Sequence, residues 1–357
     1  MNEAAGGDSK MTERNDLLAS IAHSIRTYRE GEIPPPTPAH VDRWASQFSP
    51  DQQLPFLREF DHVIRHSFVE SSDVVTFFDE LLPHTNLVGS NPAAYWAASN
   101  FLRIQQDGQS QKHMTALLGE RLKAQFNLDI AKCGSANGDF IYLDDVLFSG
   151  NRIASDLEKW IANDAPKKAV VQIILIAFHT GGQYYLSSKR LKKAIADSKK
   201  DITVNFWRIL EVQNQAYWKY TSDVLWPSSI PAIPEVQAYV ASEQRYPHQL
   251  RQPGGKTMFF SSEEGRQVLE QEFLIAGVKI RGKIANPKSV LRPLGFSMFG
   301  VGFGSLIATY RNCPNNCPLA LWWGDPDAKT GPFSWYPLLP RKTYASAENV
   351  FGKPDDF

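Results

Sequence analysis

Residues 140–152 carry most of the information about the fold, and they read Phe-Ile-Tyr-Leu-Asp-Asp-Val-Leu-Phe-Ser-Gly-Asn-Arg. An apolar strand ends in two adjacent acids, Asp144 and Asp145, and a short loop with Ser149 and Gly150 leads into an amphipathic helix. In open α/β sheets, ligands bind at the carboxyl ends of the strands. Two carboxylates there can hold sugar hydroxyls or a hydrated Mg²⁺, and the amides of the loop and helix start can hold a phosphate. The stretch therefore predicts a site for a phosphorylated sugar.

Helices and strands alternate along the middle of the chain. Periodicity predicts strands at 101–105, 140–143, 170–178 and 202–210, and helices at 113–126, 151–163 and 187–198. The run at 170–178 is almost wholly apolar, which is typical of parallel strands covered on both faces. We therefore expect an α/β fold with a parallel sheet flanked by helices.

The two ends of the chain differ from this middle part. Residues 1–12 are small and polar, so we expect a disordered tail there. Residues 13–90 show helical patterns and form a predicted N-terminal helical section. Residues 91–357 are expected to hold the α/β core and an irregular C-terminal extension. Within that extension, Leu306–Tyr310 and Pro318–Trp323 read as strands.

Composition limits the classes of partner. Lys plus Arg and Asp plus Glu both number 38, so the formal net charge is zero. Broad attraction to nucleic acid or to an anionic membrane is not indicated, although a local basic patch stays open. The chain starts without an apolar signal segment, and its longest apolar run, at 169–178, is too short for a membrane helix. Cys313 and Cys317 are expected to be buried free thiols, and the three cysteines of the chain fit a reducing cytoplasm.

The paired acids allow two other interpretations. The acids could simply cap the following helix, but two adjacent carboxylates repel each other unless a cation or ligand offsets their charge. They could also be the metal-binding acids of an ATPase, which requires a P-loop. The best match, Gly254-Gly255-Lys256-Thr257, has Leu250 where the first glycine belongs and follows the acids along the chain. We interpret it as a glycine-rich turn that carries a lysine.

With these residues in place, the chain resembles the phosphoribosyltransferase fold. The resemblance implies that Asp144 and Asp145 face the ribose of phosphoribosyl pyrophosphate (PRPP). It implies that the 5-phosphate is held by Ser149, Gly150, Asn151 and Arg152. Two positions depart from the family pattern, since Phe148 stands where a hydroxyl residue is usual and Arg152 replaces a Thr or Ser.

An earlier loop matches the family by its position. The resemblance places a pyrophosphate-binding loop after the strand at 101–105, at Gln106, Asp107, Gly108, Gln109 and Ser110. An ordinary polar turn is the alternative, and the sequence leaves both open.

A more specific resemblance extends over roughly residues 37–342. Val41-Asp42-Arg43-Trp44, the acid loop, Tyr310–Asn316 and Trp335–Arg341 occur in one order that resembles the phosphoribosyltransferase-like effectors of bacterial conflict and antiphage systems. This resemblance implies a defence role beside a protein partner, such as a sensor or a reverse transcriptase.

The Tyr310–Asn316 segment offers further polar side chains. Arg311, Asn312, Asn315 and Asn316 can contact a base or a phosphate, and a tight turn between two strands is the alternative.

Two functions stay open at this point. The leading hypothesis is an enzyme that binds PRPP or a nucleotide and transfers or cleaves at the anomeric carbon. Mg²⁺ would then be held by Asp144 or Asp145 rather than by a protein cage. The alternative is a catalytically inactive module that senses such a ligand and switches a partner protein.

Overall fold

The computed structural model describes residues 2–105 and 109–341. The chain forms two compact units, and each is considered by itself. Unit 1 combines the N-terminal segment, up to Ser71, with the segment that begins at Tyr217, and unit 2 is Ser72–Ala216. The sequence had suggested a division near residue 90, whereas the spatial division falls at 71 and 216. Unit 2 is therefore inserted, along the chain, between the two parts of unit 1.

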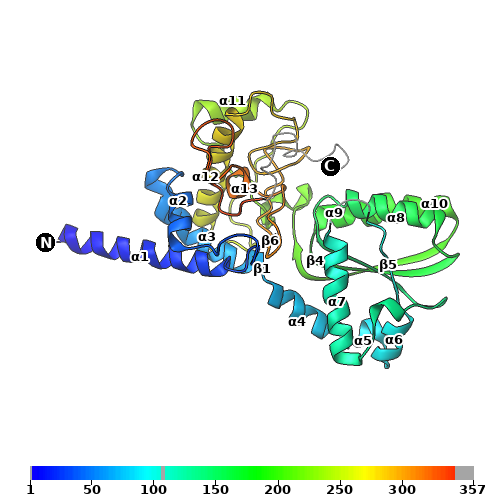
Figure 1. Ribbon diagram of the computed structural model, residues 1–357. Coiled ribbons are helices and arrows are strands. Elements are labelled where there is room, and N and C mark those ends of the chain that lie inside the picture. The colour runs from blue at the N-terminus through cyan, green and yellow to red at the C-terminus, as the bar shows by residue number, and fades with distance from the viewer. Residues whose placement is uncertain (1, 106–108, 342–357) are drawn as a thin grey trace. The chain divides into compact units, whose positions relative to one another are not determined.

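Unit 2 contains the parallel sheet. In chain order its elements are α4 (Ser71–Leu81), α5 (Thr85–Val88), α6 (Pro92–Ala98), β2 (Asn100–Phe101), α7 (Ser110–Phe126), η2 (Ile130–Lys132), β3 (Phe140–Leu147), α8 (Asn151–Asn163), β4 (Lys168–His179), α9 (Thr180–Tyr185), η3 (Leu186–Leu191), α10 (Lys192–Ser198) and β5 (Asp201–Val212). The four strands lie in the order β2-β3-β4-β5, and every neighbouring pair is parallel. All four carboxyl ends therefore meet at one edge of the sheet. This α/β architecture confirms the predicted fold class (Figure 1).

Helices cover both faces of this sheet. Because side chains alternate along a strand, Val171 and Ile173 lie on one face and Gln172 on the other. The first face packs against α8 and the helices that follow β4, in a core that includes Leu157 and Leu191. On the second face, Trp207 of β5 donates to Gln172 over 2.8 Å, and the Trp207 ring lies 5.5 Å from the ring of His84. The near-continuous burial of β4 follows from this double cover.

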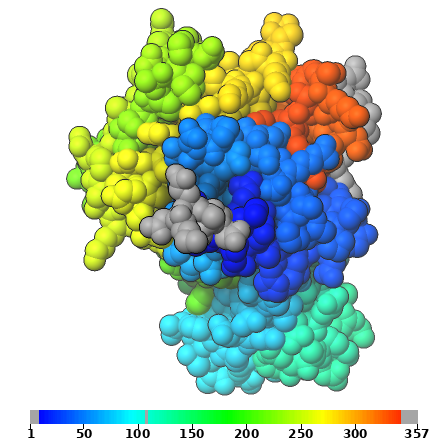
Figure 2. Space-filling view, turned by 90° about the vertical axis from the view of Figure 1, so that its left-hand side faces the viewer, coloured from blue at the N-terminus to red at the C-terminus, as the bar shows by residue number. Residues whose placement is uncertain are grey.

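Unit 1 is mainly helical. Its elements are α1 (Asn2–Ser24), α2 (Pro38–Ala45), η1 (Pro50–Gln52), α3 (Gln53–Ser67), β1 (Phe68–Val69), η4 (Ala216–Thr221, which begins at the last residue of unit 2), α11 (Pro234–Ser242), α12 (Glu263–Gly282), β6 (Ala308–Thr309) and α13 (Leu319–Trp322). The short strands β1 and β6 pair in parallel and join the two parts of the chain. In Figure 2 the early residues, in blue, lie beside the late residues, in orange, on one surface of this unit.

An aromatic core joins these early and late segments. Trp44 and Phe60 have ring centroids 4.9 Å apart, and Phe273 of α12 packs against both. The indoles of Trp44 and Trp335 both donate to the carbonyl of Ala320, over 2.8 and 2.9 Å. Trp322, Trp323 and Trp335, from the C-terminal part of the chain, are all buried.

Several local predictions differ from the structure. Pro318–Trp323 was expected to be a strand, but α13 occupies most of it, because a short apolar run fits a buried helix as well as a strand. Strand β2 is limited to Asn100–Phe101, and α7 begins at Ser110 rather than at 113. Helix α1 includes much of the section for which the sequence predicted disorder. None of the helices in the described residues is both long and apolar enough to cross a membrane.

Candidate functional site

The two predicted acids project from β3 near its carboxyl end. Asp144 and Asp145 are neighbours on a strand, so their side chains start toward opposite faces of the sheet. Asp144 is only 3% exposed, whereas Asp145 is half-buried. The Asp144 carboxylate accepts the Asp145 backbone N–H over 2.9 Å, and that of Asp145 accepts the Val146 N–H over 2.7 Å. Of the two acids, Asp145 is thus the one that a ligand can reach directly.

A hydrogen bond joins the acids to the start of α7. The Ser110 hydroxyl donates to Asp144 Oδ1 over 2.5 Å. Gln105, which follows β2, contacts Ser110 through its side-chain amide at 3.0 Å and accepts the Gln111 N–H at 3.0 Å. Gln111 in turn accepts the backbone N–H groups of Ile104 and Gln105. Ser110, the last residue of the predicted pyrophosphate loop, is therefore held beside Asp144, and Gln105, which precedes that loop, is joined to it.

Only part of that loop can be placed. Gln109 precedes the first residue of α7 and Ser110 is that first residue. Gln106, Asp107 and Gly108 lie outside the described residues. The role predicted for these five residues therefore stays a prediction, although Ser110 lies at the predicted site.

Burial governs the charge of Asp144. Removal from water raises its pKa from the ordinary 3.8 to about 7, and the nearby charge of Asp145 acts in the same direction. The Ser110 hydrogen bond and the positive charge of Arg152 oppose this shift. Asp144 is therefore a group that can hold or release a proton near neutral pH.

The predicted phosphate loop follows β3 and leads into α8. Gly150 has φ +78° and occupies the position before the first helical residue, which leaves the first amides of α8 pointing out of the helix. Ser149 and Arg152 are exposed, and Asn151 Oδ1 accepts a hydrogen bond from Arg190 over 3.2 Å. Ser149, Gly150, Asn151 and Arg152 thus form one turn at a helix N-terminus, with Ser149 and Arg152 exposed and Gly150 buried, an arrangement that can bind an anion.

Close packing fixes the inner side of this loop. A Cβ atom on Gly182, in α9, would lie 1.9 Å from the Phe148 carbonyl oxygen, so only glycine fits there. The Phe148 ring stacks on the His179 ring, with centroids 4.8 Å apart. Phe148 therefore packs the loop against the end of β4. It does so at the position where the family pattern usually has a hydroxyl residue.

The ends of β4 and β5 add a polar network that the sequence did not reveal. Thr180 donates to the side chain of Gln213 over 2.7 Å, and the Gly181 N–H donates to that of Asn214 over 2.8 Å. His179 is fully buried and contacts the Leu147 carbonyl at 3.2 Å, and burial lowers its pKa to about 3. A neutral imidazole therefore links β4 to β3. The polar side chains that follow the two strand ends, Thr180, Gln213 and Asn214, were a usable signal in the sequence.

The predicted contacts from the C-terminal segment lie in unit 1. Asn312 and Thr309 exchange backbone hydrogen bonds of 3.1 Å, as in the tight turn that was the alternative interpretation. The Asn316 side chain donates to the Phe296 carbonyl over 3.0 Å, and the Asn315 carbonyl accepts the Phe296 N–H. The backbone around Arg311 belongs to the same turn. A ligand role for Arg311, Asn312, Asn315 and Asn316 stays a prediction, and they are not brought together with Asp144 in one unit.

The residues suit a magnesium ion only if a ligand completes its coordination. Within residues 2–105 and 109–341, no three His, Cys, Asp or Glu side chains lie together so that they could hold a metal. Mg²⁺ commonly binds through one or two carboxylates together with substrate phosphates. The half-buried carboxylate of Asp145 fits that pattern.

Of the comparisons with known proteins, the one with family models gave a match. The family model PRTase-CE, which describes phosphoribosyltransferase-like effectors, matches residues 41–341. That range includes the whole of the site in unit 2 and most of unit 1. Searches of curated proteins and of solved structures found no match.

Proposed function

We propose a function for this chain from the premise that it belongs to PRTase-CE, a family of phosphoribosyltransferase-like effectors. The protein binds PRPP or a nucleotide at the carboxyl edge of the unit 2 sheet. It then transfers or cleaves the group at the anomeric carbon of the ribose. The observation that carries the proposal is the hydrogen bond between Ser110 and Asp144. It brings the start of α7 to the acids of β3. A phosphorylated ribose that spans the two loops would touch both.

Each residue has a defined part in this proposal. Asp145 accepts hydrogen bonds from the ribose hydroxyls and offsets the positive charge of an oxocarbenium-like sugar. Ser149, the first amides of α8 and Arg152 hold the phosphate. Anchoring that remote group positions the anomeric carbon against the acids. Mg²⁺, held by Asp145 and the ligand, would neutralise a departing pyrophosphate.

Asp144 has a separate part, because it is buried and starts toward the other face of the sheet from Asp145. With a pKa near neutrality, it can take up or release a proton when the charge near it changes. Its hydrogen bond to Ser110 then transmits that change to the α7 loop.

The wider role proposed is that of an effector in an antiphage defence system. The support is the family assignment, which identifies an effector. A protein partner from the same system, such as a sensor or a reverse transcriptase, would control when the site acts.

The test compares turnover in two aspartate variants. The full chain is incubated with Mg²⁺ and either PRPP or a nucleotide, and release of pyrophosphate or base is measured. Asp145→Asn is expected to reduce turnover by about 100-fold or more, since it removes a charge that faces the reacting sugar. Asp164→Asn, an exposed change at the other end of α8, is the matched control and should leave turnover unchanged. If the full chain shows no turnover of these ligands and also binds none of them, the proposal is refuted.

A sensor that binds without turnover is the second candidate. Two observations favour it: Phe148 replaces the usual hydroxyl and stacks on His179, and Asp144 is buried. It predicts that PRPP or a nucleotide raises the melting temperature without being consumed, and that Asp145→Asn removes the stabilisation.

A further inference from the structure

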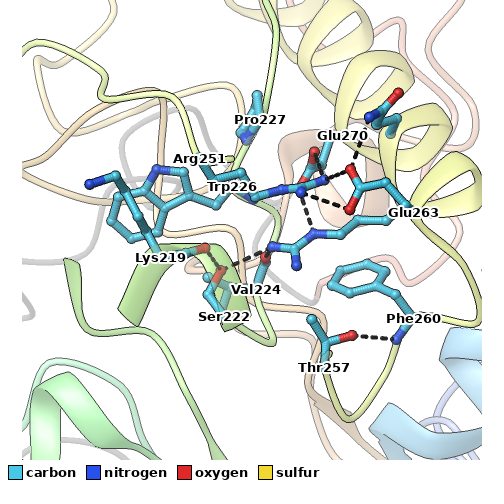
Figure 3. Close-up of polar contacts among 12 residues, drawn as sticks. Lys219, Ser222, Val224, Trp226, Pro227, Arg251, Thr257, Phe260, Glu263 and Glu270 are labelled. Carbon is cyan, nitrogen blue, oxygen red and sulfur yellow. Dashed lines mark hydrogen bonds and ion pairs between the residues drawn. The ribbon is translucent and has the colours of Figure 1, made fainter. Parts of the chain in front are cut away.

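A second pocket lies in unit 1, and the proposed function does not use it. Its volume is about 280 Å³, and it is lined by the 254–257 loop, by residues 260–263 and by Arg266. Figure 3 shows Thr257 and Phe260 in the lower part of this region and Glu263 above them. We propose that this pocket binds a phosphoryl anion through Arg266, Lys256 and the backbone amides of the loop. The loop is the glycine-rich turn that the sequence had separated from a P-loop.

The first support is a buried guanidinium that is not fully paired. Arg266 is 1% exposed. Its Nε donates to Glu270 over 2.8 Å, and its Nη2 donates to Ser222 over 3.0 Å and to the Val224 carbonyl over 3.2 Å. Its Nη1 is also buried and has no hydrogen-bond partner among the described residues. A buried donor of this kind usually has a partner, so a ligand that supplies an acceptor would complete it.

The neighbouring carboxylates are already engaged. Arg251 makes two hydrogen bonds of 2.9 Å with Glu270 and two, of 3.0 and 2.8 Å, with Glu263 (Figure 3). Glu263 also accepts the Gly254 N–H and the Gln267 side chain, each over 2.9 Å. Although burial opposes it, the Arg251 interaction holds the pKa of Glu263 at about 2. Burial lowers the pKa of Arg266 and the charge of Arg251 acts in the same direction, whereas the charge of Glu270 opposes the shift. The Phe260 ring centroid lies 4.7 Å from the Arg266 guanidinium carbon.

The 254–257 loop still offers hydrogen-bond donors, although the neighbouring carboxylates already have partners. Within the described chain, the amides of Gly255, Lys256 and Thr257 make no hydrogen bond, and the exposed Lys256 ammonium forms no ion pair. A Cβ on Gly255 would lie 2.0 Å from the Tyr220 carbonyl oxygen, so the loop backbone packs closely against the backbone at Tyr220. Helix α12 begins at the same pocket, and its N-terminus favours negative charge. The pocket is therefore rich in unused donors, which suits an oxyanion.

Acids at the rim set where the anion can lie. Glu59 is buried and accepts both the N–H and the hydroxyl of Ser261, and Glu264 is exposed in the first turn of α12. Their charges disfavour an anion near Ser261. We therefore place the phosphoryl group nearer Lys256 and Arg266 than Ser261.

Binding is tested on the full chain with inorganic phosphate and, separately, with ATP. Affinity is measured by calorimetry at two salt concentrations, and the site is located by hydrogen exchange at residues 254–266. Lys256→Glu is expected to weaken binding about tenfold or more, because it reverses a charge that faces the ligand. Lys279→Glu, an equal charge change at an exposed position farther along α12, is the matched control.

A second variant guards against unfolding and against confusion with the unit 2 site. Arg266→Met keeps most of the side-chain volume, and its folding is checked by circular dichroism. It should abolish binding, whereas Asp145→Asn should leave this affinity unchanged. Binding of phosphate alone would indicate free phosphate as the ligand. Binding of ATP alone would indicate a phosphate ester, provided that it persists in Asp145→Asn and is lost in Arg266→Met. Either result supports the site. Failure of both to bind, or equal loss in Lys256→Glu and Lys279→Glu, would overturn it.

Discussion

Two glycine-containing loops, one in each unit, lie next to the N-terminus of a long helix, and they differ in the charge buried beside them. The 148–151 loop of unit 2 precedes α8 and lies near a buried acid, Asp144. The 254–257 loop of unit 1 lies beside α12 and a buried base, Arg266. Under the proposed function, the half-buried Asp145 takes the sugar hydroxyls beside the first loop and the exposed Arg152 takes the phosphate, whereas a buried cation beside the second loop can pair with a phosphate itself. The two loops thus suit different ligand groups.

The largest expected effects on stability come from the glycines at which each loop packs closely against another backbone segment. Gly182→Val and Gly255→Val each force a side chain against a carbonyl oxygen, at 1.9 and 2.0 Å from the new Cβ. We expect each to reduce the free energy of unfolding of its own unit by about 3 kcal/mol or more. Hydrogen exchange resolves the units separately. Gly254→Ala is the control for the second loop, since nothing lies within 4 Å of its Cβ and only its φ of +92° is unfavourable. Equal effects of the Gly254 and Gly255 changes would contradict the packing described.

The next effect concerns the buried acid. Because the pKa of Asp144 is raised from 3.8 to about 7, the folded state holds its proton more tightly than the unfolded state does. Stability therefore falls as pH rises between these values, by roughly 2–4 kcal/mol. Asp144→Asn should remove that slope and stabilise unit 2 at pH 8. Denaturation by urea at pH 4 and pH 8 measures it. An unchanged slope in the variant would show that Asp144 is ionised in water-like surroundings.

A smaller effect is expected at the hydroxyl that joins α7 to the acid. Ser110→Ala should cost about 1–2 kcal/mol of stability, because it removes a buried hydrogen bond to Asp144. It should also raise the pKa of Asp144 further, since that hydrogen bond favours the charged form. An NMR titration of the carboxyl carbon measures the shift. Ser155→Ala, at an exposed position on α8, should change neither quantity.

The smallest effect on stability is expected at Lys256. Lys256→Ala removes an exposed side chain without a described ion pair, so the free energy of unfolding should change by less than about 0.5 kcal/mol. Thermal melting without added anion checks this. A large loss would mean that Lys256 holds the loop together and is not reserved for a ligand.

Local signals in the sequence predicted a good part of unit 2. Helix α8 has the predicted bounds, because Gly150 marks its start and its apolar residues recur at helical spacing. The fold class followed from the alternation of strands and helices. The hydrogen bond between Ser110 and Asp144 joins residues that are 34 positions apart along the chain, and no local sequence pattern encodes such a contact.

Unit 1 was much less predictable for the same reason. Its core joins Trp44 to Ala320 and Phe273, residues that only the folded chain brings together. The 254–257 loop stood out in the sequence through its glycines and lysine, but Arg266 did not, because nothing in a helical Arg indicates an unpaired buried nitrogen. Burial is a tertiary property, and the pocket depends on it.

The insertion of unit 2 within unit 1 has a consequence during translation. Among the described residues unit 2 is one continuous segment, so this segment can fold once Ala216 has left the ribosome. Unit 1 must wait for α12 and α13 before its aromatic core can close. At about 5–20 residues per second, the intervening synthesis takes on the order of ten seconds. During that interval α1, α2 and α3 have no C-terminal partner, and their exposed apolar faces are the surfaces that a chaperone would bind on the nascent chain.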